Sequence, residues 1–201
     1  MKAIILRISK NVIAMTLVFV LLFTMTTKAS AYIPFGVIGS GLYGNYVVRA
    51  KTHWCWAACA ENINRWNNTP VLRQRDAVHA IKGTATDPYP DVSGTEYETC
   101  LAAAFISNYS KSFINTDLLQ YDDVCDQLYS NHHTIIACLW PLLSGGTEGH
   151  EVLIEAWYNP DGSERVTYFD PGNGRNISTR YEDLCCNFDT GFVCLSQIVE
   201  V

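Results

Sequence analysis

The sequence predicts an α+β protein whose first half is mostly helical and whose second half is mostly β-strand. Three patterns carry this prediction. An apolar stretch that opens without β-branched residues keeps helical spacing over residues 54–66. Residues 150–158 alternate as in a strand. The turn-forming segment 159–162 then separates this strand from a second β-rich run over 166–169.

The stretch from Trp54 to Trp66 is the clearest helix. Its first two turns are apolar on nearly every side, which is typical of a helix buried between two layers. Segment 67–70 ends in proline and is expected to terminate the helix. One face collects Cys55, Ala58, Cys59, Asn62, Ile63 and Trp66.

The other elements follow from periodicity and from helix and turn signals. Thr95 and Glu98 are three residues apart and predict a capping box before a helix from Cys100 to Tyr109. Residues 32–53 have no clear period and are expected to form an extended or looped lead-in. We expect further helices over 71–81, 122–129 and 179–184, and further strands over 133–140 and 192–201.

The first 31 residues have the pattern of a secretory signal peptide. Lys2, Arg7 and Lys10 precede a largely apolar stretch, 12–23, and the small residues 29–31 follow it. That stretch is shorter than the roughly 18 residues of a spanning helix. We therefore divide the chain into a signal peptide, 1–31, and one domain, 32–201, and expect a secreted, extracellular protein. The alternative is an uncleaved anchor.

Composition argues against several classes of protein. The 201-residue chain is 48 % hydrophobic and 17 % charged, which excludes a disordered protein. The predicted signal peptide holds four of the 14 basic residues and none of the 20 acidic ones, so residues 32–201 carry a net charge of about −10. This acidic balance is atypical of proteins that bind nucleic acid or anionic membranes.

All eight cysteines lie after residue 31, where an oxidising compartment favours disulfide bonds. If one cysteine is kept as a thiolate, seven remain, so at least one more has no disulfide partner. Cys185 and Cys186 are adjacent and cannot bridge each other without strain. A metal cluster is the alternative for Cys125, His132, His133 and Cys138, but their spacing matches no common zinc site. Since the chain is expected to be secreted, we expect Cys125 and Cys138 to be disulfide partners instead.

Cys55 is the first candidate for chemistry. At a helix N-terminus, unpaired N–H groups and the positive end of the helix dipole favour the thiolate, which is the nucleophilic form. The same N–H groups can receive the negative oxygen of a tetrahedral intermediate. A structural role, buried or in a disulfide, is the alternative for a lone cysteine.

His150 and Asp170 favour the catalytic interpretation. If the hairpin loop is four residues long, His150 lies opposite residue 171, and a shift of one residue sets it beside Asp170. A carboxylate there can accept a hydrogen bond from the imidazole and orient it. A sheet histidine and a turn-capping aspartate are the alternatives for each residue alone. Together with Cys55 they predict a Cys-His-Asp site.

Three segments of the chain resemble the signature blocks of papain-like cysteine peptidases. The closer likeness is to the compact bacterial branch, labelled C39-like or papain-like, which includes the staphopain-like proteases. The likeness covers residues 54–174, and the chain order Cys, His, acid also matches. The segments are Trp54-Cys55-Trp56-Ala57-Ala58-Cys59, Gly149-His150-Glu151-Val152-Leu153-Ile154 and Tyr168-Phe169-Asp170-Pro171-Gly172.

This resemblance implies a papain-like fold, in which a helical lobe carries Cys55 on its central helix and an antiparallel β lobe carries His150 and Asp170. It implies a cysteine endopeptidase in which Cys55 is the nucleophile and forms a thioester. His150 would be the general base and later the acid, and Asp170 would orient its ring. One position departs from the family: a Gln about six residues before the nucleophile is replaced by Arg49. Its guanidinium could donate in place of the amide, or the oxyanion hole is weaker.

The expected partner is a polypeptide, bound by a monomer in the groove between the lobes; no nucleic acid, membrane, metal or cofactor is expected. Because residues 32–53 are too short for a folded pro-domain, we expect control by a protein inhibitor, by redox state or by delivery. Two other functions stay open. The same triad could serve an acyl transferase, deamidase or amidase, and Arg49 favours a non-catalytic secreted binding protein with this fold.

Overall fold

The described part of the chain forms one compact unit within Pro34–Val201. The predicted signal peptide, 1–31, lies outside the described residues and stays a prediction. None of the described helices is long and apolar enough to cross a membrane. The structure, a computed structural model, describes residues 35–37, 46–66, 73–83, 86–107, 113–130, 133–141, 149–159, 161–187 and 191–199.

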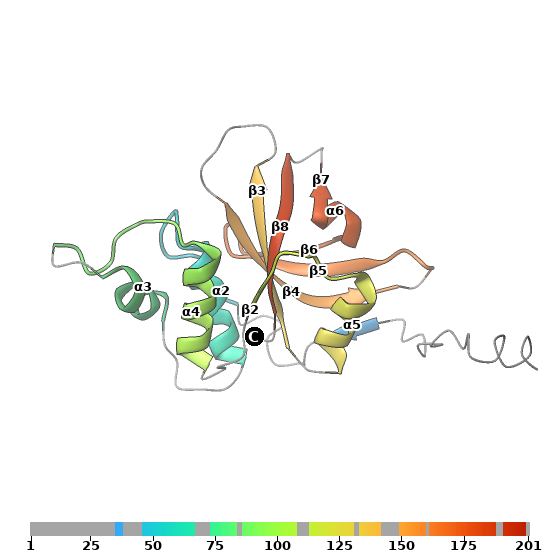
Figure 1. Cartoon of the computed structure of the whole chain (residues 1–201), viewed down its shortest axis with the longest axis horizontal. Helices are drawn as coiled ribbons and strands as arrows, with labels where there is room; N and C mark the ends of the chain where they lie inside the picture. Colours follow the sequence, from blue (N-terminus) through green and yellow to red (C-terminus); the bar gives the residue numbers. More distant parts are fainter. Residues whose placement is uncertain are drawn as a thin grey trace, which may run out of the picture. The chain divides into compact units, whose positions relative to one another are not determined.

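Eight strands of the described residues form one antiparallel sheet (Figure 1). Its main path runs β2-β8-β3-β4-β5-β6, while β1 pairs with β4 and β7 with β8. The strands are β1 Phe35–Val37, β2 Phe113–Asn115, β3 Ile135–Pro141, β4 His150–Tyr158, β5 Arg165–Asp170, β6 Arg175–Arg180, β7 Cys186–Asn187 and β8 Phe192–Val199.

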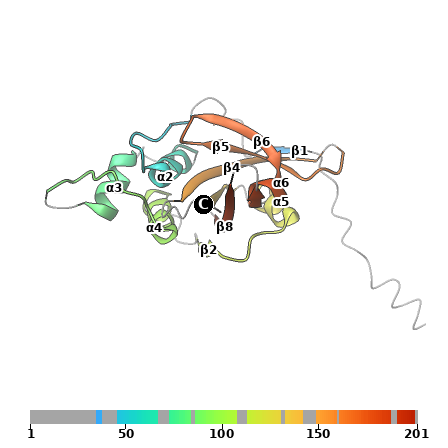
Figure 2. The same cartoon turned by 90° about the horizontal axis from the view of Figure 1, so that it is seen from above.

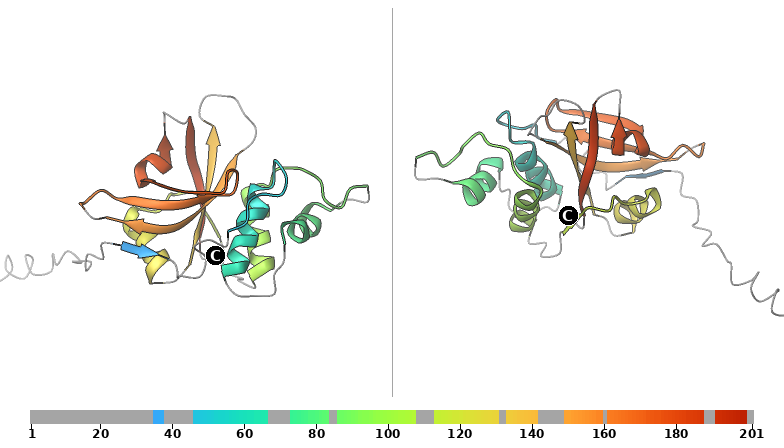
Figure 3. Two further views of the ribbon diagram at one scale, coloured as in Figure 1. Left: turned by 180° about the vertical axis from the view of Figure 1, so that it is seen from behind. Right: turned by 45° about the horizontal axis from the view of Figure 1, so that its top comes forward.

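The described helices lie at two ends of this sheet. Figures 1 and 2 agree that α2, α3 and α4 gather at one end and that α5 and α6 lie at the other, and Figure 3 gives the same separation from two further sides. Each helix overlaps one that the sequence predicts, so the α+β class is confirmed. The helices are α2 Cys55–Trp66, α3 Gln74–Lys82, α4 Glu96–Ser107, α5 Tyr121–Tyr129 and α6 Tyr181–Cys185.

Helix α2 is buried between the sheet and the other two helices at its end. Its residues 56–60 are fully buried. Cys59 and Ile63 pack in one core cluster with sheet residues such as Leu153 and Phe169. On the opposite side, Trp56, Ala57 and Ala60 pack with Ala77, Val78 and Ala102 of α3 and α4. The prediction of a helix between two layers is confirmed.

The start of α4 has the predicted capping box. The backbone N–H of Thr95 donates to Glu98 Oε2 at 2.8 Å, and the backbone N–H of Glu98 donates to Thr95 Oγ1 at 3.2 Å. These bonds satisfy two donors that a helix start otherwise leaves without partners. They fix the residue at which α4 begins.

The loop of the β4–β5 hairpin is longer than the four residues predicted. Tyr158 pairs with Arg165, so the loop spans residues 159–164. Its far side is an aspartate turn, in which the Ser163 N–H donates to Asp161 Oδ1 at 3.0 Å. Gly162 sits in this turn with φ +83°. The turn continues past the glycine, which lengthens the loop by two residues.

A bulge over residues 154–156 then changes the register of β4 against β5 by one residue. Continued to the end of the hairpin, the pairing sets His150 opposite Gly172 rather than residue 171. Asp170 becomes the diagonal neighbour of His150. A diagonal neighbour is still within reach of long side chains, so the contact forms despite the different register.

Some strands have no counterpart in the prediction. Strand β6 has the polar sequence Arg-Asn-Ile-Ser-Thr-Arg and is largely exposed at the end of the strand order. A polar edge strand lacks the apolar alternation on which the prediction depends. Strands β1 and β2 have three residues each, too few for a period.

The expected disulfides are not present. No disulfide joins any of the eight cysteines, all of which lie in the described residues. Cys125 lies on α5, where its thiol bonds to Tyr121. Cys138 instead packs in the core cluster beside Cys59 of α2. The two thiols therefore contact different residues, and the expected Cys125–Cys138 disulfide is wrong.

Candidate active site

Cys55 is the first residue of helix α2. The Ala58 N–H donates to the Trp54 carbonyl at 2.9 Å, which closes the first helical turn. The backbone N–H groups of residues at the start of such a turn have no carbonyl partner within the helix. The Cys55 side chain is only 7 % exposed, so its sulfur lies at this helix start largely shielded from water.

His150 and Asp170 lie beside this sulfur. His150 Nε2 lies 2.7 Å from Asp170 Oδ1. The same imidazole is hydrogen-bonded to the Cys55 thiol. Because Nε2 is taken by the carboxylate, Nδ1 is the ring nitrogen left to face the sulfur. The structure thus brings together the three residues that the sequence singles out.

The loop after β5 fixes the Asp170 carboxyl. The Gly172 N–H donates to Oδ1 at 2.7 Å, and the Asn173 side-chain amide donates to Oδ2 at 2.7 Å. A Cβ at position 172 would lie 2.9 Å from Asp170 Oδ1 and 3.2 Å from His150 Cε1. Glycine is therefore the residue that lets the loop approach the histidine and the acid.

The surroundings of Cys55 favour its ionised form. Burial alone raises the pKa of the thiol, but the hydrogen bond and the positive charge of His150 act in the opposite direction. The backbone N–H groups of Glu151 and Trp56 also bond to the sulfur. The net result is a pKa below the usual value for cysteine, as a reactive thiolate requires.

His150 and Asp170 titrate in matching directions. Burial lowers the pKa of His150, but the hydrogen bond that its ring donates to Asp170 and the contact with Cys55 outweigh burial and raise it to about 9. Burial raises the pKa of Asp170. Its contacts with His150, the Gly172 N–H and the charge of Arg49 lower the pKa by more, so the net pKa lies below the usual value for aspartate. The three shifts therefore all favour one state of the site, with a thiolate, an imidazolium and a carboxylate in a row.

Arg49 contacts the acid's loop. Its backbone N–H donates to the Pro171 carbonyl at 2.9 Å, and its charge lowers the pKa of Asp170. The sequence leaves two possibilities open: the Arg49 guanidinium donates into the oxyanion hole, or the hole is weaker. The contacts that the structure gives Arg49 are with the Asp170 loop instead.

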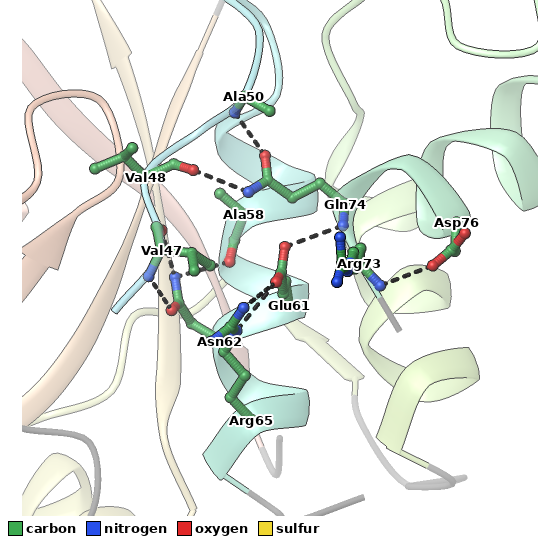
Figure 4. A network of polar contacts seen from close by, with 10 residues as sticks. All are labelled: Val47, Val48, Ala50, Ala58, Glu61, Asn62, Arg65, Arg73, Gln74 and Asp76. Atoms are coloured by element: carbon green, nitrogen blue, oxygen red, sulfur yellow. Dashed lines mark hydrogen bonds and ion pairs between the residues drawn. The ribbon is translucent and has the colours of Figure 1, made fainter. Parts of the chain in front are cut away.

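The segment that carries Arg49 is clamped to α2 and α3 (Figure 4). Buried Asn62 accepts the Val47 N–H at 2.9 Å and donates to the Val47 carbonyl at 3.0 Å. Gln74 accepts the Ala50 N–H at 2.8 Å and donates to the Val48 carbonyl at 2.9 Å. Through the bond from Arg49 to Pro171, the clamp ties the helix that carries Cys55 to the loop that follows Asp170.

Two hollows adjoin His150. One, with room for about one water molecule, is lined by Cys55, His150, Glu96 of α4 and residues of β3. The other, of about 840 Å³ including open space, is lined by His150, Asp170 and apolar residues of β4, β6 and α6. Of the two, only the second has room for a side chain of a bound molecule.

Sequence reasoning missed several residues around the site. Glu151, Gly172, Asn62 and Gln74 were given no role by the sequence, yet they contact or support the three central side chains. One signal was available for Glu151. It lies two residues before Leu153 and so on the same face of β4, which the structure buries. Asn62 was placed on the buried face of α2, and a polar residue there requires a partner.

The described residues contain no cluster of three or more His, Cys, Asp or Glu side chains that could hold a metal. One member of the set considered from the sequence, His132, lies outside the described residues.

Comparison with known proteins gives little. No protein-family model matches the chain, and no curated protein matches it either. Among solved structures, 31 chains match. One is a digestive procathepsin L2 proteinase from Tenebrio molitor larval midgut, with 11 % identity over 86 % of this chain and 70 % of that chain and a TM-score of 0.41. A likeness of this size does not assign a fold family, so function is argued from the site.

Proposed function

We propose that the chain is a secreted, papain-like cysteine endopeptidase that hydrolyses peptide bonds with Cys55, His150 and Asp170. Among such peptidases it would belong to the compact branch that its sequence resembles. One observation carries the proposal: the Cys55 thiol bonds to the His150 ring, and that ring lies 2.7 Å from Asp170. This is the arrangement of nucleophile, base and orienter that acyl transfer requires.

In the first step, the Cys55 thiolate attacks the carbonyl carbon of the peptide bond and a C–S bond forms. The carbonyl oxygen becomes an oxyanion, which backbone N–H groups at the start of α2 can stabilise. The His150 imidazolium then donates its Nδ1 proton to the leaving nitrogen. The C–N bond breaks, the amine departs, and a thioester remains on Cys55.

In the second step, neutral His150 takes a proton from water, and the resulting hydroxide attacks the thioester carbon. The C–S bond breaks, the carboxylic acid product leaves, and the thiolate–imidazolium pair is restored. Asp170 keeps the ring oriented in both steps and stabilises its positive form. No metal or redox partner takes part in these steps.

A polypeptide is the substrate that suits the site. The larger hollow is lined by His150 and Asp170 and has room for a side chain of a polypeptide bound beside the reacting pair. Secretion rests on the pattern of residues 1–31. We also propose that the chain is a monomer and that a protein inhibitor, redox state or delivery controls it, because residues 32–53 are too short for a folded pro-domain.

The direct test is cleavage of denatured casein by protein purified after expression of the full chain. We expect cleavage, and we expect Cys55→Ala to lower its rate by at least about 10³-fold, because the nucleophile is lost. Cys59→Ala is the matched control. Cys59 lies one turn further along the same helix, fully buried, and its loss should leave most of the activity.

Other outcomes would contradict the endopeptidase. Release of ammonia or acyl transfer without chain cleavage would indicate a deamidase or transferase that uses the same triad. If neither casein nor other acyl substrates react, and iodoacetamide does not label Cys55, the chain is a binding protein.

A further inference from the structure

The larger of the two hollows beside His150 is bounded by the sheet and by the short helix α6. Its lining comes from β3, β4, β5, β6, α6 and β8. About 330 Å³ of the hollow is open to a bound group. Since a cavity of about 150 Å³ already holds a benzene ring, this hollow has room for a large side chain, aromatic ones included.

The walls of the hollow are mainly apolar. Three of the apolar lining residues are buried and three are half-buried, so an apolar interior opens to solvent. The buried three are Leu139, Val152 and Leu184, and the half-buried three are Tyr168, Ile177 and Phe192. An apolar side chain that leaves water for such walls is stabilised in proportion to the area it buries.

Two acids also line the hollow, and both are already bound to a cationic side chain. Asp170 Oδ1 lies 2.7 Å from His150 Nε2. The Asp183 carboxylate accepts hydrogen bonds from the Arg180 guanidinium at 2.9 and 3.0 Å. A charged side chain that entered would lose its water and compete with these pairs. The walls therefore favour an apolar occupant over a charged one.

The position of the hollow assigns it to one part of a bound substrate. Among the described residues, His150 and Asp170 line it, whereas Cys55 does not. In the proposed reaction the carbonyl carbon bonds to Cys55, and the leaving nitrogen takes its proton from His150. The part of the substrate that departs with this nitrogen therefore lies nearest the hollow.

We propose that this hollow binds a large apolar side chain, aromatic or aliphatic, of the substrate residue directly after the cleaved bond. The proposal rests on the proposed function, since it names the class of polypeptide that the site cuts. The α-carbon of that residue is bonded to the leaving nitrogen, so its side chain begins close to His150. Binding in the hollow acts before the amine departs and therefore raises kcat/KM.

The test uses fluorogenic peptides in which phenylalanine replaces alanine at one position at a time around the cleaved bond. Directly after that bond, phenylalanine should raise kcat/KM by about tenfold or more, because its ring leaves water. Thr179→Trp should bring this ratio to about one, since the indole would fill the hollow. Thr179 lines the hollow from β6, the last strand of the main path. The alanine peptide should be cleaved as fast as before.

Two further variants accompany Thr179→Trp. Asn176→Trp is the matched control, because Asn176 is exposed on the same strand and is not part of this lining. It should leave the ratio at the wild-type value. Ile177→Ala removes part of the apolar wall without adding bulk to the strand, and it should lower the ratio by about threefold or more.

A second measurement separates this proposal from the proposed function. Alkylation of Cys55 by N-benzyl iodoacetamide and by iodoacetamide needs the thiol and the hollow but no peptide hydrolysis. The amide nitrogen of the benzyl reagent takes the place of the leaving nitrogen and carries the ring toward the hollow. The ratio of the two rates should fall in Thr179→Trp and stay at the wild-type value in Asn176→Trp.

The outcomes distinguish the two proposals. If peptides are cleaved with no preference for phenylalanine directly after the bond, the apolar subsite is wrong while the peptidase stands. The same holds if Thr179→Trp and Ile177→Ala change neither ratio. If no peptide is cleaved but the alkylation ratio falls as expected, the subsite stands and the peptidase is wrong.

Discussion

At the scale of single residues, the site depends on how two opposing influences on Cys55 are resolved. Burial favours the neutral thiol, and the imidazolium of His150 favours the thiolate. His150 can keep its proton to about pH 9 because Asp170 accepts a hydrogen bond from its far nitrogen. Asp170 therefore acts on the sulfur through the ring, without touching it.

Replacing Asp170 tests this relation. In Asp170→Asn the raised pKa of His150 should fall toward the ordinary value of about 6.5. The alkaline limb of kcat/KM against pH, which the loss of the imidazolium proton sets, should then move from about 9 to lower pH. The rate at the optimum should fall by about 10²-fold or more. Asp76→Asn, on the exposed start of α3, is the control, and an alkaline limb that stays in place in Asp170→Asn would contradict the relation.

At the scale of elements, the hairpin β4–β5 and the turn after it align the base with the acid. Gly172 is in contact with both side chains. Gly162, in the loop at the far end of the same hairpin, has φ +83° and nothing within 4 Å of an added Cβ. Gly172 is required because the loop passes close to two side chains, whereas Gly162 is required because its backbone is left-handed.

Alanine at the two glycines should therefore have different effects. Gly172→Ala should lower kcat/KM by about tenfold or more while changing stability little, because the new methyl group displaces the carboxyl or the ring. Gly162→Ala should cost about 1 kcal/mol of unfolding free energy through its left-handed backbone and leave kcat/KM of the folded enzyme unchanged. Denaturant unfolding and peptide hydrolysis, measured on both variants, distinguish the two. The same profile in both variants would mean that Gly172 acts through the backbone alone.

Some of these elements can be predicted from the sequence and others cannot. Apolar spacing locates α2, β4 and β8, because each buries a face and a buried face leaves a period. It cannot locate β6, whose polar residues lie at an exposed edge. Cys55, His150 and Asp170 were found from the helix start, the strand and the turn that carry them. The length of the hairpin loop was not, since it depends on an aspartate turn at Asp161, and so the predicted pairing partner of His150 was wrong.

At the scale of the whole molecule, strand β4 is buried on both faces although two of its residues are acids. Glu155 is 4 % exposed, and neither of its carboxyl oxygens has a partner in the structure. Burial raises its pKa to about 7. An alternation of acidic and apolar residues is typical of a strand with one wet face, which is why the sequence does not reveal this burial.

Glu155 should therefore make the fold less stable as pH rises. The pKa of Glu155 is higher in the folded chain than in the unfolded chain. Below about pH 4.5 the carboxyl is neutral in both states, and its burial costs the fold no charge. As pH rises through about 7, the stability that the neutral carboxyl gives the folded chain is lost. Glu155→Gln removes this dependence. Relative to wild type, the unfolding free energy of the variant should rise by roughly 1–3 kcal/mol between pH 5 and pH 8. Urea unfolding at the two pH values measures it, and an equal difference at both would show that Glu155 does not titrate in this range.

The ionised sulfur of Cys55 underlies both the proposed reaction and the role of every residue around it. The rate of its alkylation by iodoacetamide, followed against pH by mass spectrometry of the peptide that contains Cys55, reports the thiolate directly. In the wild type the midpoint should lie below pH 9, and in His150→Ala it should move to higher pH, because burial is then opposed only by the backbone N–H groups of Glu151 and Trp56. A wild-type midpoint at or above 9, or the same midpoint in both proteins, would contradict the ion pair.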